Sequence, residues 1–219
     1  MNSPIKTILI IGGTGFLGRN IVKCLSINRH RLIILTRNRK SAEEIFHYED
    51  DLDIFEGELS DLDKITGIIN DFKVDIVIHL ASNLIPNSNK TEFYKELNDI
   101  VLPTFELSYI LANKEIELIF FSSAGTIYGN HHVLLSENTQ LNPINNYGFS
   151  KLLIEKNILF NSRCNGLSYV IFRPSNVYGK ISRIKDQGFI EVAVEKIMNR
   201  ESIEIWGSGQ QKRDYLHVS

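Results

Sequence analysis

The sequence predicts an α/β fold in which a doubly wound, mostly parallel β-sheet carries helices on both faces. Two observations lead to this prediction. Strand and helix patterns alternate along the 219 residues, and the first strand pattern runs into a glycine-rich turn that opens a helix. Strand–helix–strand units have right-handed crossovers, which place helices over both faces of a parallel sheet. A strand, a glycine turn and a helix in this order are typical of a Rossmann-type, dinucleotide-binding domain.

The glycine-rich turn lies in the N-terminal stretch TILIIGGTGFLG. Ile8 to Ile11 form an apolar run without polar alternation, as in strands that are buried on both faces. Gly12, Gly13 and Gly15 allow the backbone to turn tightly and to approach a ligand closely. A helical pattern starts at Phe16, and the unpaired N–H groups of its first turn suit a pyrophosphate.

The remaining elements follow from apolar runs and helical spacing. We expect five further strands at residues 31–36, 52–55, 75–80, 117–122 and 168–172. We expect helices at residues 41–48, 61–72, 92–113 and 147–163. Ser41 and Glu44 have the spacing of a capping box for the first of these helices, and Asp61 or Ser60 is expected to cap the second. Pro103 is expected to kink the third helix or to delay its start.

The pattern changes after Arg173, and we therefore expect two regions. Residues 1–173 are expected to form an NAD(P)-binding Rossmann domain, and residues 174–219 part of a substrate-binding region interwoven with the sheet. In the second region we expect a polar loop at 180–187, a helix at 188–199 and short strands at 203–206 and 215–218. Because the sequence stops directly after the last strand pattern, we expect a truncated chain with only the start of a smaller C-terminal substrate domain.

Composition excludes several classes of partner. A formal net charge of −2 and a pI near 6.3 give the chain no general attraction to nucleic acid or to an anionic membrane. Cys24 and Cys164 are interpreted as free thiols in a reducing compartment. We find no signal peptide and no apolar run long enough to cross a bilayer, so we expect a cytoplasmic protein. His131 and His132 have no acidic or thiol companions, so no metal site is expected, and His79 is interpreted as a core residue.

The segment YGFSK places Tyr147 and Lys151 four residues apart at the start of a helix, so both side chains share one face. A tyrosine phenol with a pKa near 10 is a poor base at neutral pH. A lysine ammonium and a cationic nicotinamide ring both favour the phenolate, and a shift of the pKa to about 7 needs roughly 4 kcal/mol. Such a tyrosine can take a proton from a sugar hydroxyl while hydride leaves the same carbon. An isolated pair with this spacing is often only a surface feature, but its position after the fifth strand favours a catalytic pair.

Seven segments in the same order resemble the extended short-chain dehydrogenase/reductases, and among them the NAD-dependent epimerase/dehydratase family with its UDP-glucose 4-epimerases. The segments are GGTGFLG, GELSD, HLAS, SSAGTIYG, YGFSK, RPSNVYG and RDYLHV. The resemblance implies an NAD(P)-dependent nucleotide-sugar epimerase, most of all one that inverts C4 of a UDP-hexose by transient oxidation, in pathways that usually feed surface polysaccharides. It leaves open a nucleotide-sugar reductase, dehydratase or decarboxylase, and a catalytically silent NAD(P)-binding protein.

The resemblance also assigns roles to matching positions. It implies cofactor contacts for Gly12, Gly15, Phe16, Leu17, Gly18, Glu58, Leu59, Leu80, Ala81, Ser82, Ser122, Tyr147, Lys151 and Pro174. It implies substrate contacts for Ser123, Asn176 and Arg213, although Asn176 could instead cap a turn and Arg213 could be a surface charge. Asn98 matches a helix asparagine that supports the site. The resemblance further implies a homodimer in which the helices at 92–113 and 147–163 build a four-helix bundle.

The catalytic hydroxyl departs from the family pattern. Where the family usually has serine or threonine, this chain has Ala124. A hydroxyl is needed to hydrogen-bond the reacting oxygen and to direct the proton. Ser123 is our first choice for this hydroxyl and Thr126 our second. The segment also lacks the Asp–Glu pair of the sugar 4,6-dehydratases, which argues against elimination of water.

The end of the second strand also departs from the pattern. An acidic residue about 20 positions after the glycine turn normally binds the ribose 2′-OH of NAD. Thr36 and Arg37 stand there in this chain, followed by Asn38 and Arg39. A guanidinium is well suited to a 2′-phosphate, which slightly favours NADP over NAD. NAD stays open, because Arg37 can also stack on the adenine.

Overall fold

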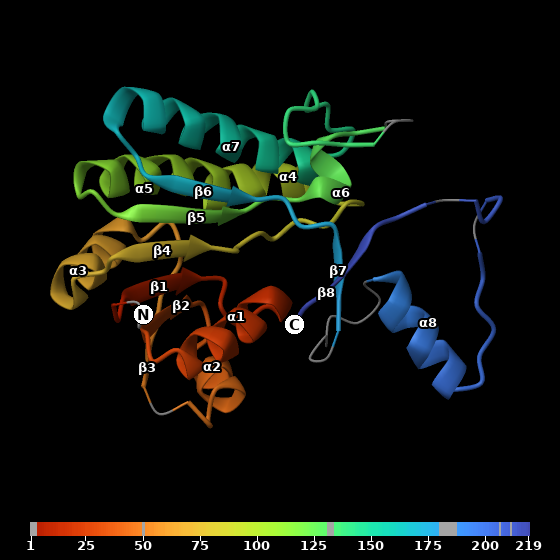
Figure 1. Cartoon of the computed structure of the whole chain (residues 1–219), viewed down its shortest axis with the longest axis horizontal. Coiled ribbons are helices and arrows are strands. Elements are labelled where there is room, and N and C mark those ends of the chain that lie inside the picture. Colours follow the sequence, from red (N-terminus) through yellow and green to blue (C-terminus); the bar gives the residue numbers. More distant parts are fainter. Residues whose placement is uncertain (1–3, 50, 131–133, 180–187, 206, 211) are drawn as a thin grey trace.

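A six-stranded, fully parallel sheet forms the centre of the molecule (Figure 1). The computed structural model describes residues 4–49, 51–130, 134–179, 188–205, 207–210 and 212–219. The strands are β1 (Thr7–Ile11), β2 (Arg31–Thr36), β3 (Leu52–Glu56), β4 (Ile76–His79), β5 (Glu117–Phe121) and β6 (Tyr169–Phe172). They lie in the order β3-β2-β1-β4-β5-β6, which confirms the predicted doubly wound sheet. The order reverses between β1 and β4, the position at which such sheets bind ligands.

Helices cover the two faces of the sheet and create two apolar cores. On one face, Leu9 and Ile11 of β1 pack with α3 (Leu62–Phe72), α5 (Leu102–Asn113) and α7 (Asn146–Asn165). On the other face, Ile8 and Ile10 pack against α1 (Phe16–Ile27) and α2 (Arg39–Ile45). The alternation of side chains along β1 therefore explains why the strand is apolar throughout: each face needs its own apolar residues.

The predicted long helix at residues 92–113 is interrupted in the structure. It consists of α4 (Lys90–Glu96), the π-helical turn η1 (Leu97–Val101) and α5. Pro103 stands in the first turn of α5, where its missing N–H costs least. The irregularity predicted at Pro103 is therefore present, and it takes the form of a π-turn just before the proline.

Two predicted caps have different outcomes. The side chain of Asn38 accepts a hydrogen bond from the Ser41 N–H at 2.9 Å, so α2 begins at Arg39 and the predicted capping box of Ser41 is wrong. Asn38 lies three residues before Ser41, which is the usual capping distance. Its side chain therefore takes the Ser41 N–H, which the Glu44 side chain would accept in the predicted capping box. Asp61 caps α3 by accepting from the Lys64 N–H at 3.2 Å, which decides between Asp61 and Ser60.

The C-terminal region contains α8 (Phe189–Met198) and a second, two-stranded parallel sheet of β7 (Asn176–Tyr178) and β8 (Tyr215–His217). Figure 1 shows α8 beyond β7 and β8, away from the main sheet. Strand β7 was not predicted, and neither was the single turn α6 (Ala124–Ile127). The predicted strand at 203–206 is absent from its described residues 203–205, where Ile203 and Ile205 are exposed and have no strand partner.

Some predictions concern residues outside the described ranges. The loop at 180–187, His131 and His132 lie outside the described residues. Cys24 and Cys164 are both exposed free thiols, as predicted. None of the helices in the described ranges has the combination of length and apolar character that crossing a membrane requires. The boundary between residues 173 and 174 stays a prediction.

Candidate cofactor and catalytic site

The glycine turn after β1 lets other groups approach its backbone closely. Gly12 has φ +84°, and a Cβ at this position would lie 2.8 Å from the backbone nitrogen of Ala81. No residue with a side chain fits there without strain and a clash. The Gly15 N–H closes the turn on the Gly12 carbonyl at 3.2 Å, and α1 starts at Phe16 directly after it. The turn thus holds the unpaired N–H groups of the α1 N-terminus at the carboxyl edge of the sheet.

Gly18 serves the same turn from within α1. A Cβ at Gly18 would overlap the backbone of Gly13, so only glycine lets the helix pack this closely on the turn. Gly18 is buried and does not line the cavity described below. Gly18 thus has a packing role, the role of the third glycine of such a turn in dinucleotide-binding folds, and its predicted contact with a cofactor stays a prediction.

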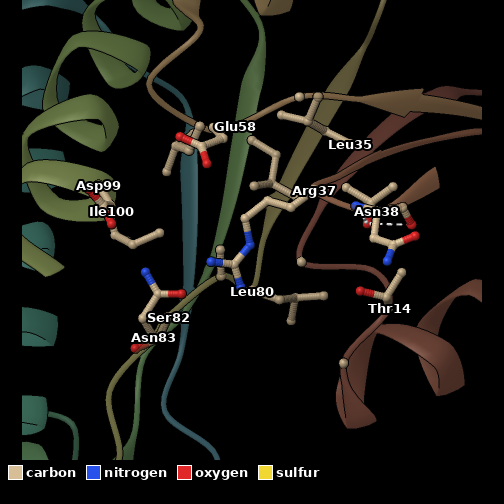
Figure 2. Close-up of a pocket in the computed structure, with 17 residues that line it drawn as sticks. Thr14, Leu35, Arg37, Asn38, Glu58, Leu80, Ser82, Asn83, Asp99 and Ile100 are labelled. Carbon is tan, nitrogen blue, oxygen red and sulfur yellow. Dashed lines mark hydrogen bonds between the residues drawn. The ribbon is translucent and has the colours of Figure 1, made fainter. Parts of the chain in front are cut away.

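A cavity of about 340 Å³ opens beside this turn, at the carboxyl ends of β1 to β4 (Figure 2). The predicted cofactor residues in its lining are Gly12, Gly15, Thr36, Arg37, Glu58, Leu59, Leu80, Ala81 and Ser82. The lining also includes Asn38, considered above for a 2′-phosphate, and residues that we did not predict, namely Ile11, Thr14, Leu35, Gly57, Asn83, Asp99 and Ile100. Phe16, Leu17, Ser122, Pro174, Tyr147 and Lys151 do not line it.

At the end of β2, Arg37 is the cationic side chain that reaches the cavity. The Oγ1 of Thr36 accepts from the Asn38 N–H at 3.3 Å, and the Asn38 side chain caps α2. Arg39 is paired with Glu43, with Nε 2.7 Å from Oε1. Arg37 is exposed and its guanidinium extends into the middle of the cavity (Figure 2). Of these side chains, Arg37 is the one placed to meet a ligand.

Tyr147 and Lys151 lie one turn apart on α7, as predicted. Lys151 is buried, and its Nζ donates to the Phe121 carbonyl at the end of β5, at 3.1 Å. The same Nζ lies 5.6 Å from the centre of the Tyr147 ring. The start of α7 is held in place by Asn145, whose side chain accepts from the Gly148 N–H at 2.8 Å. The pair therefore sits on a capped, rigid helix beside the edge of the sheet.

Burial governs the protonation of this pair. It lowers the pKa of Lys151 to about 8, against the carboxylates of Glu96 and Glu155, which raise it. Burial also raises the pKa of Tyr147, and Glu96 adds to this, whereas a hydrogen bond with Ser123 lowers it. Burial therefore disfavours the phenolate of Tyr147. Lys151 still carries most of its positive charge at pH 7.

Three hydroxyls near Ala124 have different surroundings. Ser123 is the N-cap residue of α6 and makes no capping hydrogen bond, and its hydroxyl lies close enough to the Tyr147 phenol to lower the pKa of that phenol. The Oγ atoms of Ser122 and Thr126 are buried and have no hydrogen-bond partner among the described residues. A Cβ on Gly125 would lie 3.9 Å from both Ser123 Oγ and Asn176 Oδ1. Ser123, Tyr147 and Asn176 therefore meet in one place.

The other predicted contacts lie farther from the cavity. Asn176 is exposed, and its amide donates to the Asp214 carbonyl at 3.0 Å, which links the starts of β7 and β8. Arg213 is exposed and donates to the neighbouring Lys212 carbonyl. The Pro174 carbonyl accepts from the Ala124 N–H at 2.9 Å. Asn98 is exposed and donates to the Tyr94 carbonyl, and its predicted support of the site stays a prediction.

A cofactor of the dinucleotide class fits these residues. The turn at Gly12 leaves room that a Cβ would fill, and the cavity lies at the switch point of the sheet beside a helix N-terminus. Among known families, the profile of the "NAD dependent epimerase/dehydratase family" matches residues 8–219. The chain belongs to this family.

Individual relatives of this family member carry names of two related activities. A provisionally named UDP-glucose 4-epimerase of Methanocaldococcus jannaschii is 34% identical over 96% of this chain and 69% of that protein. A dTDP-4-dehydro-6-deoxyglucose reductase of Escherichia coli is 31% identical over 100% of this chain and 71% of that protein. The solved UDP-glucose 4-epimerase of Thermotoga maritima, with UDP-glucose, superposes with a TM-score of 0.87, 26% identity, and coverage of 97% of this chain and 69% of that one.

Membership in the epimerase/dehydratase family confirms the predicted fold class and NAD(P) dependence. A further solved structure, MoeE5, 25% identical with a TM-score of 0.79 over 97% of this chain and 68% of that one, holds UDP-glucose and NAD. Neither finding discriminates between NAD and NADP for this chain. The assignments of individual site residues remain predictions.

An ion pair that sequence analysis missed, between the buried Glu155 and the partly buried Arg173, holds α7 to the end of β6. Arg173 donates from Nε and Nη2 to both carboxylate oxygens of Glu155, at 3.0 and 2.7 Å. Its Nη1 donates to the Tyr128 hydroxyl at 2.9 Å and to the Glu137 carbonyl at 3.1 Å. The pair joins α7, β6 and the segment after α6 around the site. A signal was available, because Glu155 follows Lys151 by four residues and so shares its helix face.

Proposed function

We propose that this chain is an NAD(P)-dependent nucleotide-sugar epimerase that inverts C4 of a UDP-hexose. The observation that carries the proposal is the cluster of Tyr147, Lys151 and Ser123 at the carboxyl edge of a dinucleotide-binding sheet. Family membership and the similar UDP-glucose 4-epimerases support the same chemistry. The substrate assignment is drawn from those relatives.

In the proposed mechanism the Tyr147 phenolate takes the proton from the sugar 4-OH and later returns it. Ser123 lies beside Tyr147 and is proposed to bond the same sugar oxygen. The Lys151 ammonium lies beneath the phenol ring and stabilises the phenolate by its charge. When bound, the nicotinamide would supply the reversible hydride acceptor that this chemistry requires. Asn176, next to Ser123, is proposed to contact the sugar, and Arg213 its phosphates.

The cofactor preference follows from the end of β2. Arg37 is the cation that extends into the cavity, and no carboxylate stands at the residue that usually binds a ribose 2′-OH. A guanidinium bonds a phosphate in a bidentate manner. We therefore propose a modest preference for NADP, with NAD as the alternative cofactor.

Interconversion of UDP-glucose and UDP-galactose tests the proposed function. We expect the 219-residue chain, supplied with NAD or NADP, to equilibrate the two sugars without net change in cofactor absorbance at 340 nm. Tyr147→Phe, which keeps the ring and removes the proton acceptor, is expected to be inactive while still binding the cofactor. Activity of this variant equal to that of the parent would sink the assignment of Tyr147.

A reductase is the second candidate, because the Escherichia coli relative carries that name. The same assay separates the two activities: net consumption of NADPH with a 4-keto sugar nucleotide indicates a reductase. If neither UDP-hexose nor keto sugar turns over while the cofactor binds, the chain is a catalytically silent NAD(P)-binding protein.

We further propose a homodimer through the outer surfaces of α4, α5 and α7. Figure 1 shows α5 and α7 side by side on one face of the sheet, and they pack against each other. Four large apolar or aromatic side chains on these helices are at least half exposed: Tyr94 on α4, Leu102 and Tyr109 on α5, and Phe160 on α7. Two copies packed there would form a four-helix bundle. Light scattering of the purified chain tests this, and a monomer at all concentrations contradicts it.

We also propose a cytoplasmic location. The exposed thiols of Cys24 and Cys164 fit a reducing compartment, and cell fractionation would check this.

A further inference from the structure

Glu96 is a buried carboxylate that the mechanism above does not use. It is the last residue of α4, directly before the π-turn η1, and only 1% of it is exposed. A buried carboxylate is costly unless hydrogen bonds and opposite charge compensate it. In the sequence it looks like one more charge on a polar helix, between Lys95 and Asn98. Its surroundings explain why it is inside.

Glu96 binds the turn that follows β4. Its Oε1 accepts from the Ser82 hydroxyl at 2.7 Å, and its Oε2 accepts from the Asn83 N–H at 2.8 Å. The Ser82 hydroxyl in turn accepts from the Leu84 N–H at 3.2 Å. Ser82 and Asn83 line the cofactor cavity (Figure 2). The carboxylate therefore fixes the backbone of one wall of that cavity.

The same carboxylate faces the catalytic pair on α7. Its negative charge raises the pKa of Lys151 and also that of Tyr147. Lys151 also interacts with Glu155 on α7, which raises its pKa, and with His79 at the end of β4. Asp99 follows Glu96 by three residues, in η1. The pKa of His79 is lowered to about 3 by burial and then by Lys151, so this ring is neutral and adds no charge at pH 7. Glu96 therefore binds the turn at Ser82 and Asn83 and acts through its charge on Lys151 and Tyr147.

The π-turn after Glu96 accounts for its position. A π-turn contains one residue more than the α-helical turn that it replaces, so α4 and α5 present different faces to the sheet. Glu96 thus points to the β4 turn, while Ile100 and Val101, four and five residues later, enter the apolar core. Such turns are frequent at functional sites.

We propose that Glu96 is a positioning residue that fixes the cofactor-binding turn at Ser82 and Asn83 and sets its charge against Lys151 of the catalytic pair. The catalytic part rests on the proposed function. The binding of the turn stands on the two hydrogen bonds of Glu96, and the effect of its charge on Lys151 is what titration tests.

Glu96→Gln removes the charge and keeps the shape. The Gln oxygen can accept from the Asn83 N–H, and the Ser82 hydroxyl can rotate to accept from the amide. Glu106→Gln is the matched control, because Glu106 is an exposed carboxylate on α5. In chains labelled with ¹³C at the lysine ε-carbon, the Lys151 signal titrates apart from surface lysines and is assigned by its loss in Lys151→Arg. We expect Glu96→Gln to lower its midpoint by at least 0.5 pH unit and the control to leave it unchanged.

Cofactor binding tests whether Glu96 fixes the turn at Ser82 and Asn83. Glu96→Ala leaves the Asn83 N–H unpaired, and we expect a tenfold weaker Kd for NADH or NADPH by fluorescence, against less than threefold for Glu96→Gln. If the Glu96 variants fail to fold, Ser82→Ala keeps the charge, removes one hydrogen bond, and is expected to weaken the Kd at least threefold. An unchanged Lys151 midpoint in Glu96→Gln, or an unchanged Kd in folded Glu96→Ala or in Ser82→Ala, overturns the proposal.

The pH profile links Glu96 to catalysis. If the parent interconverts UDP-hexoses, the alkaline limb of kcat in Glu96→Gln is expected to move to lower pH by the shift that NMR measures, with KM nearly unchanged. A fixed limb despite a shifted Lys151 midpoint rules out the catalytic part. If the parent shows no turnover, the proposed function fails, whereas the NMR and binding results still decide the role of Glu96.

Discussion

The Ser123 hydroxyl lies beside the Tyr147 phenol and lowers its pKa, although the two residues come from the turn before α6 and from α7. Thr126, the other candidate hydroxyl, is buried, and its Oγ1 has no partner in the described part of the chain. Because proton transfer needs direct contact with the reacting oxygen, we predict that Ser123→Ala lowers kcat by about 100-fold. Initial rates of UDP-hexose interconversion measure this effect.

Thr126→Val is the matched control for Ser123→Ala. It removes a hydroxyl that bonds nothing in the described structure and keeps the β-branched shape, so we expect less than a threefold change in kcat. A larger loss in Thr126→Val than in Ser123→Ala would reverse our order of the two hydroxyls.

Arg37 offers a prediction about cofactor choice. Its guanidinium reaches into the cavity from the end of β2, whereas Arg39 is engaged by Glu43. We predict that Arg37→Ala weakens NADP binding about 10- to 100-fold and NAD binding less than threefold, because only NADP carries the 2′-phosphate. Fluorescence titrations with NADPH and NADH provide the two Kd values, and Arg39→Ala is the control. Equal losses for both cofactors would indicate that Arg37 stacks on the adenine.

The sheet could be predicted because parallel strands need apolar residues on both faces, which leaves continuous runs such as Ile8 to Ile11. The cap of α2 was missed because Ser41 and Glu44 also satisfy a capping pattern, and the choice between caps depends on the chain leaving β2. Strand β7 was missed because it is only three residues long and pairs with β8 nearly 40 positions later. Local patterns do not report pairings over such separations.

The residues of the site also divide into those that local sequence patterns predict and those that they do not. Gly12, Arg37 and Leu80 could be predicted because each directly follows an apolar strand, and parallel strands bring their carboxyl ends to one edge. Asp99 and Glu96 could not, because their side chains reach the site only through the π-turn between α4 and α5. The raised pKa of Tyr147 could not be predicted, because a sequence does not show the burial that raises it.

Gly18 permits a prediction about stability with an internal control. A Cβ at Gly18 would overlap the Gly13 backbone, which cannot move without breaking the turn, so Gly18→Ala is expected to lower the free energy of unfolding by about 2 kcal/mol or more. A Cβ at Gly67, inside α3, would meet nothing within 4 Å. Gly67→Ala is expected to raise the free energy of unfolding by about 0.5–1 kcal/mol, because alanine favours helix. Urea unfolding measures both, and a stable Gly18→Ala would disprove the close packing of α1.

His79 permits a prediction about acid stability. Its Nε2 is 2.8 Å from the Thr104 Oγ1, which itself donates to the Ile100 carbonyl, so Nε2 must carry the proton toward Thr104. Its Nδ1 is buried without a hydrogen-bond partner among the described residues, and protonation there would bury a charge near Lys151. Burial, and then Lys151, lower its pKa to about 3 in the folded chain, against about 6.5 in the unfolded chain.

Between these two pKa values the unfolded chain binds the extra proton, so folding stability falls as the pH drops below about 6.5. The contribution of His79 is about 1.4 kcal/mol per pH unit at most. We predict that His79→Asn has a shallower loss of stability than the parent between pH 6 and pH 4, by about 1 kcal/mol per unit, in urea unfolding. His47→Gln, at an exposed histidine, is expected to follow the parent. A parallel decline in all three proteins would show that His79 is protonated equally in the folded and unfolded chains.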